Sequence, residues 1–160
     1  MSATSALVRA AAASMPPITT EVSVTLPVAA ADAFEVFADA GETPRWLRVV
    51  QAAHVLDRTA DNRPLTVSFR AAFDRATIGY VVRYRYDPGA LTIHWATRRS
   101  AAIRVEGEAR FTALSARASL MTYRLSLELP VSQDWLECHY DGHAASAVVG
   151  DFREHLRRFT

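Results

Sequence analysis

The chain has 160 residues, half of them hydrophobic, and a formal net charge of +1. This length suits one domain, because a chain of about 150 residues buries roughly 70% of its unfolded surface around a single core. The balanced charge argues against nucleic-acid binding, which requires clustered positive charge, and the hydrophobic content argues against disorder.

Residues 1–17 are rich in alanine and serine and end in Met15-Pro16-Pro17, so we expect a flexible tail. Arg9 interrupts this stretch too early for the apolar centre of a signal peptide, and no apolar run reaches the ~18 residues of a membrane span. A lone cysteine, Cys138, excludes an intrachain disulfide and favours a reducing compartment. We therefore expect a cytoplasmic protein with one domain over residues 18–160.

The chain begins its ordered part with a strand over residues 19–26, where Val22, Val24 and Leu26 alternate with polar side chains. A helix is predicted over residues 29–40, with Gly41 as its stop. A second short helix is predicted to start near residue 42, with Pro44 in its first turn and with Trp46 and Leu47 pointing inward.

Six further strands are predicted over residues 49–58, 64–73, 77–86, 90–98, 101–114 and 118–129. Turn-forming residues such as Asp61-Asn62 and Asp87-Pro88-Gly89 separate them, so consecutive strands form an antiparallel meander. With the first strand, the sheet has seven strands.

Alternation within these strands separates two faces of the sheet. One face is apolar and aromatic and is predicted to line the core. The other is a charged, solvated face whose cross-strand pairs are each worth about 0.2–1 kcal/mol. Its members are Arg70, Arg83, Arg85, His94, Arg104, Glu106, Glu108, Arg110 and Arg124.

The last 26 residues predict a long amphipathic helix, because a stripe recurs at three- and four-residue spacing. The stripe consists of Trp135, Cys138, Gly142, Ala145, Val149, Phe152, Leu156 and Phe159. It is bulky at both ends and small in the middle, where Ala144, Ser146 and Ala147 flank it. Such a helix cannot fill a core opposite its centre, so either another element comes very close there or a cavity lies there.

Three local sequences accompany this order of elements: Val24-Thr25-Leu26-Pro27, residues 33–39, and Pro44-Arg45-Trp46-Leu47. Together with the order itself, they resemble the helix-grip fold of the START, Bet v 1 and polyketide-cyclase (SRPBCC) superfamily. The resemblance spans residues 18–160. It implies an α+β fold in which a seven-stranded antiparallel sheet curls around the C-terminal helix and leaves an apolar cavity.

The implied cavity would lie beside the small residues at the centre of the helix stripe. We therefore interpret the residues of the inner sheet face and of the helix centre as a ligand-binding site. Tyrosine and tryptophan there would supply hydrogen bonds to a ligand, although they could equally be core aromatics with backbone partners. The predicted ligand-binding residues are Phe69, Tyr80, Val82, Tyr84, Trp95, Val105, Tyr123, Leu125, Gly142, Ala145, Ser146 and Val149.

Catalytic and metal chemistry has few candidates in this sequence. Tyr80, Tyr84, Tyr123 and His143 are the groups that could position or protonate a substrate. The cluster of Cys138, His139, Asp141 and His143 has ligand-type side chains, but the related family needs no metal, so no metal and no cofactor are expected. Glu106 and Glu108 are interpreted as surface ion-pair residues rather than as an acid and base pair.

We therefore predict a protein that binds a small hydrophobic molecule such as a lipid, an isoprenoid or a polyketide. The alternative is a polyketide aromatase/cyclase that promotes ring closure by proton transfer. A third class, protein interaction through the arginine-rich outer sheet face, is permitted but not required.

Overall fold

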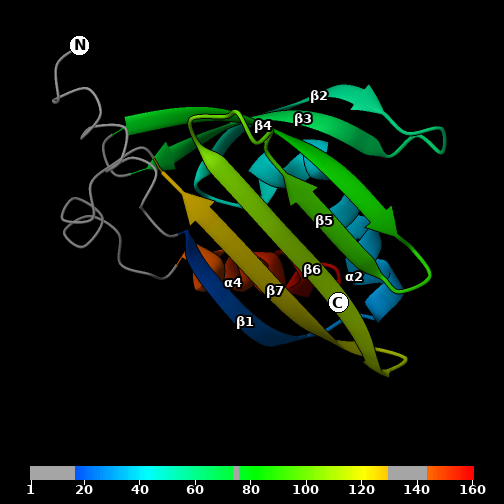
Figure 1. Cartoon of the computed structure of the whole chain (residues 1–160). Helices are drawn as coiled ribbons and strands as arrows, with labels where there is room; N and C mark the ends of the chain where they lie inside the picture. Colours follow the sequence, from blue (N-terminus) through cyan, green and yellow to red (C-terminus); the bar gives the residue numbers. More distant parts are fainter. Residues whose placement is uncertain (1–16, 74–75, 130–143) are drawn as a thin grey trace, which may run out of the picture.

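The computed structural model describes residues 17–73, 76–129 and 144–160, and these form one sheet with helices on one side (Figure 1). All neighbouring strands are antiparallel, in the order β1-β7-β6-β5-β4-β3-β2. The strands are β1 (Ile18–Leu26), β2 (Val50–Arg58), β3 (Pro64–Phe73), β4 (Ala76–Asp87), β5 (Thr92–Ala96), β6 (Arg104–Ser115) and β7 (Ala118–Glu128). The first strand, β1, pairs with the last, β7, and the other strands follow one another in sequence order. The predicted seven-stranded antiparallel sheet is thus confirmed.

Helix α2 (Ala30–Ala38) and the 3-10 helix η1 (Ala40–Arg45) connect β1 to β2, and α4 (Ala144–Arg157) is the C-terminal helix. Figure 1 shows α2 and α4 on the same side of the sheet, which curves around them. Helix α4 packs against β1 and β7, whereas α2 packs against β5, β6 and β7. This is the predicted helix-grip arrangement.

The core is aromatic, and Phe37 of α2 lies at its centre. Its ring centroid is 5.5 Å from that of Trp95 on β5, 5.9 Å from Phe111 on β6 and 5.3 Å from Phe152 on α4. Packed aromatic pairs of this kind contribute about 0.5–1.5 kcal/mol each beyond the area they bury. One phenylalanine of α2 therefore joins the sheet and the C-terminal helix into one core.

The outer sheet face is charged, as the alternation predicts. Glu21 stands opposite Arg124, Arg124 opposite Glu108, Glu108 opposite His94, and His94 opposite Arg85. This row alternates in sign over β1, β7 and β6, and Nδ1 of His94 is 3.5 Å from the Glu108 carboxylate. The charged row is solvated and leaves the opposite face of the same strands to the core.

Several predicted boundaries were wrong. The strand predicted from residue 90 begins at Thr92, because Leu91 has a φ of 47° and closes the turn that follows β4. The strand predicted from residue 101 begins at Arg104, and the first helix ends at Ala38 rather than at residue 40. The second short helix is the 3-10 helix η1, so Pro44 lies near its end and not in its first turn.

The described part of the C-terminal helix confirms most of its predicted stripe, since Ala145, Val149, Phe152 and Leu156 are buried. Phe159 is an exception. It lies beyond the end of α4 and is 67% exposed, because the helix stops at Arg157. Trp135, Cys138 and Gly142 lie outside the described residues.

Candidate ligand cavity

A cavity of about 210 Å³ lies between the inner face of the sheet, η1 and the first turns of α4. Eight of the predicted ligand-binding residues line it: Phe69, Tyr80, Val82, Tyr84, Trp95, Val105, Tyr123 and Leu125. Every one comes from β3, β4, β5, β6 or β7, so strand alternation alone brings them to one wall. Whether they contact a ligand stays a prediction.

The described lining of this cavity contains no charged side chain. Its polar groups are the hydroxyl of Thr43, the indoles of Trp46 and Trp95, and the phenols of three tyrosines. A site that is apolar apart from a few fixed polar groups is the usual form of a small-molecule pocket.

The three cavity tyrosines, Tyr80, Tyr84 and Tyr123, lie close enough to influence one another. Burial raises the pKa of Tyr80 to about 12. The pKa of Tyr84 is well above its usual 10, first because of burial and then because the phenols of Tyr86, Tyr80 and Tyr123 lie nearby. Among the described residues neither the Tyr80 nor the Tyr84 hydroxyl has a hydrogen-bond partner, so both are neutral phenols with a proton left to donate.

Trp95 lies flat on the sheet because its cross-strand neighbour is Gly107. A Cβ atom at Gly107 would be 2.1 Å from Cζ2 of the Trp95 indole and 2.2 Å from its Cε2, distances that no side chain can occupy. The glycine therefore provides the space in which the indole forms part of the cavity wall. The ring is held from the side by Tyr84 and Tyr123, with centroids 6.2 and 5.6 Å away.

The sequence did not identify the wall formed by the connection between β1 and β2. Phe37, Thr43, Trp46, Leu47 and Val50 line the cavity there. The ring of Trp46 packs on Phe152 at 5.0 Å, and its buried indole N–H has no hydrogen-bond partner among the described residues. Trp46 and Leu47 were predicted to point inward, and that signal could have extended the predicted site to this segment.

The helix contributes Ala144, Ala147 and Val148 to the lining. The predicted positions differ from these: Ala145 and Val149 are buried but do not line the cavity, and Ser146 is exposed. Successive residues of a helix point about 100° apart, so the flank of the stripe faces the cavity while the stripe itself packs onto β1 and β7. Gly142 and His143 lie outside the described residues.

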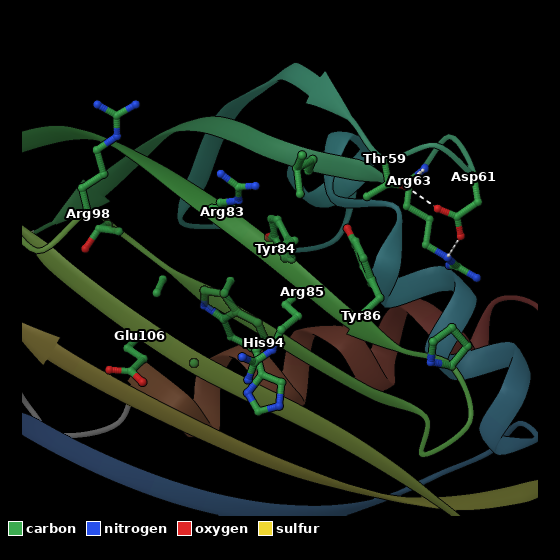
Figure 2. A pocket seen from close by; sticks show the side chains of 16 residues that line it. Thr59, Asp61, Arg63, Arg83, Tyr84, Arg85, Tyr86, His94, Arg98 and Glu106 are labelled. Atoms are coloured by element: carbon green, nitrogen blue, oxygen red, sulfur yellow. Dashed lines mark hydrogen bonds and ion pairs between the residues drawn. The ribbon is translucent and has the colours of Figure 1, made fainter.

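A second, open hollow of about 730 Å³ lies on the outer side of β4, β5 and β6. Figure 2 shows its labelled side chains, which include Arg83, Arg85, His94 and Glu106 of the predicted charged face. Arg83 and Arg85 are exposed to solvent, so a hydrophobic molecule beside them would keep much of its surface in water. This hollow is consistent with a solvated face.

Arg63 closes one end of this hollow and connects the β2–β3 turn to helix α2. Its guanidinium binds both carboxylate oxygens of Glu35, at 3.0 and 2.9 Å. Its Nε lies 3.4 Å from the carboxylate of Asp61 (Figure 2). The same guanidinium lies over the rings of Phe34 and Tyr86, 5.2 and 5.5 Å from their centroids. The hydrogen bond from Arg63 lowers the pKa of the Glu35 carboxyl.

Within the described ranges, no three histidine, cysteine or acidic side chains come together as a metal site. The predicted cluster of Cys138, His139, Asp141 and His143 lies outside these ranges. Among the described helices, none combines the length and hydropathy that a bilayer crossing needs.

Solved structures similar to this chain share its fold. A START superfamily protein from Mycobacterium smegmatis is 16% identical, with 89% of this chain and 99% of that one covered and a TM-score of 0.77. An aromatase/cyclase from a Streptomyces strain is 16% identical over 89% and 95% of the two chains, with a TM-score of 0.74. Norcoclaurine synthase from Thalictrum flavum, in complex with dopamine and hydroxybenzaldehyde, is 7% identical over 94% and 92%, with a TM-score of 0.65.

No curated protein sequence matches the chain. The sequence model of the family described as polyketide cyclase / dehydrase and lipid transport matches residues 17–160. That match covers the whole sheet and all the described helices. The chain therefore belongs to the polyketide cyclase / dehydrase and lipid transport family.

Proposed function

We propose that the protein binds one small hydrophobic molecule in the cavity between the sheet and α4. The observation that carries this proposal is the cavity of about 210 Å³, bordered mainly by apolar and aromatic side chains from strands β2 to β7, α2, residues 43–47 and α4. Burial of apolar surface gives about 25 cal/mol per Å², so a ligand in such a lining gains most of its affinity from desolvation. Of the ligand classes that the sequence suggests, isoprenoids and polyketides of small size fit better than long-chain lipids.

The cavity volume supports this limit on ligand size. An apolar protein cavity of roughly 150 Å³ holds benzene, and a water molecule takes up about 30 Å³ in the liquid. A space of about 210 Å³ therefore suits a substituted single ring or a fused pair of rings. A longer ligand would extend beyond this space or require the walls to move apart.

The alternative function, catalysis of ring closure by proton transfer, has less support from the described lining. Tyr80 and Tyr84 have raised pKa values, so they are hydrogen-bond donors at neutral pH and not bases. The described cavity wall contains no histidine or carboxylate to act with them. Binding is thus the function that the geometry favours.

Native mass spectrometry of the purified protein, followed by calorimetric titration with naphthalene, tests the proposal. We expect a retained small molecule or a bound naphthalene with one site per chain. Val148→Phe should weaken naphthalene binding at least tenfold, because the larger ring occupies space at the cavity wall.

Val81→Phe is the matched control, since Val81 lies on the outer face of β4, is 44% exposed and does not line the cavity. It should bind naphthalene as the wild type does. The proposal fails if the wild type binds no such molecule, or if Val148→Phe folds and binds with unchanged affinity.

A further inference from the structure

We propose that this cavity selects a neutral ligand that accepts a hydrogen bond from the hydroxyl of Tyr84, such as an aromatic ketone, and rejects its ionised carboxylate counterpart. This inference rests on the proposed function, because it assigns the polar chemistry of the same cavity. It makes Tyr84 the specificity-determining residue.

The rejection of anions follows from the absence of a cation in the described lining. An ionised carboxylate that leaves water needs a paired positive charge or several hydrogen bonds, since the uncompensated ion is strongly disfavoured in an apolar site. The arginines nearest in sequence to the cavity residues, Arg83 and Arg85, alternate onto the outer face and are exposed. Thus the strand pattern that builds the cavity also keeps positive charge out of it.

The preference for an acceptor follows from the environment of Tyr84. Its side chain lines the cavity and is 8% exposed, and its phenol is near those of Tyr80 and Tyr123. Its hydroxyl donates to no group among the described residues, so its proton is available to a ligand. A carbonyl oxygen placed against this hydroxyl gains a net hydrogen bond, whereas an apolar ring offers the hydroxyl no acceptor.

Tyr86 provides a comparison on the same strand. Its ring stacks on that of Tyr84 with centroids 5.9 Å apart, but its hydroxyl donates to the backbone carbonyl of Pro64. Tyr86 does not line the cavity. Two neighbouring tyrosines of β4 therefore differ in one respect that matters here: the protein itself satisfies only one of the two hydroxyls.

Three ligands of similar shape test the inference by calorimetric titration at pH 8: naphthalene, 2-acetylnaphthalene and 2-naphthoate. We expect the wild type to bind the ketone about fivefold more tightly than naphthalene, which is the ratio that one net hydrogen bond gives. The ionised carboxylate should bind at least a hundredfold more weakly than the ketone. Tyr84→Phe should reduce the ratio of ketone to naphthalene affinity to about one, while Tyr86→Phe should preserve it.

The outcomes separate this inference from the proposed function. If naphthalene binds but the carboxylate binds as tightly as the ketone, or if Tyr84→Phe keeps the fivefold ratio, the inference is overturned and the binding function stands. If none of the three ligands binds to the wild type, both are overturned. A circular-dichroism melting curve of each variant shows that the compared proteins are folded.

Discussion

Replacing Gly107 by alanine should displace the indole of Trp95 and close part of the cavity. Gly107 and Trp95 are directly opposite on β6 and β5, and the indole covers the glycine. An added Cβ would lie 2.1 Å from Cζ2, 2.2 Å from Cε2 and 2.6 Å from Nε1 of the ring. Favourable carbon contacts are about 3.5–4.0 Å, so the indole must retreat by roughly 1.5 Å.

The direction of that retreat is set by the neighbours of Trp95. The sheet lies beneath the ring, and Phe37, Tyr84 and Tyr123 contact its sides at centroid distances of 5.5, 6.2 and 5.6 Å. The open side is the cavity that Trp95 lines. Overpacking of this kind costs about 1–3 kcal/mol of stability, and the displaced ring takes up space that a ligand needs.

Urea unfolding measures the first effect and naphthalene titration the second. The midpoint of Gly107→Ala should fall at unchanged slope, by an amount that corresponds to about 1–3 kcal/mol. Its naphthalene affinity should fall at least tenfold.

Gly79→Ala is the matched control, because Gly79 is also a strand glycine and its added Cβ would lie 3.8 Å from the nearest atom, the carbonyl oxygen of Phe69. That variant should be as stable as the wild type or slightly more stable, since alanine loses less conformational freedom on folding. A Gly107→Ala protein with unchanged stability and unchanged naphthalene affinity would refute the described position of Trp95.

Two further predictions concern ionisable groups. Arg63→Met should destabilise the protein by about 1–2 kcal/mol in urea unfolding through loss of the contacts to Glu35 and Tyr86. Arg45→Met is the control, because it breaks an ion pair with Glu42 whose side chains are 77% and 46% exposed. It should change the free energy of unfolding by less than about 0.5 kcal/mol. Because Arg63 holds the Glu35 pKa below 4.5, the stability that Arg63 adds should be present above pH 4.5 and should decline as the pH falls further. Equal stability of Arg63→Met and the wild type at pH 7 would contradict this prediction. Burial raises the Tyr80 pKa from 10 to about 12, so wild-type stability should decline between pH 10 and 12. Tyr80→Phe should reduce this decline. An absorbance titration that finds Tyr80 ionised near pH 10 would contradict the prediction.

The strands and the sheet wall of the cavity could be predicted because their signal has a period of two residues. Phe69 and Leu125 each lie between two polar residues, and Val82 and Trp95 each have one polar neighbour, so one assignment of inside and outside fixes the whole wall. The errors in the strands lie at their ends. At Leu91 a positive φ closes the turn, although the sequence places the turn-forming Pro88-Gly89 before Ala90 and shows only a hydrophobic residue at position 91.

The wall contributed by η1 and β2 depends on contacts between residues far apart in sequence, which spacing does not report. Trp46 meets Phe152, and Phe37 meets Trp46, Trp95 and Phe152. The sequence predicts that Trp46, Trp95 and Phe152 face the core, but burial alone does not say which residue borders a void. That distinction depends on how completely the neighbouring side chains fill the space.

The difference between a residue that is buried and one that borders the cavity also applies to the C-terminal helix. A strand residue points to one of two opposite faces, whereas helix neighbours differ by about 100°, so a stripe three or four residues apart defines a broad sector and not a single direction. In α4 the centre of that sector, Ala145 and Val149, packs onto the sheet, and its edge, Ala144 and Val148, borders the cavity. Small residues at the centre therefore allow the helix to approach β1 and β7 closely, while small residues at the edge leave the space open. The small side chains of the helix stripe left two alternatives, close packing of another element or a cavity. In α4 both occur, on adjacent sides of the same two turns.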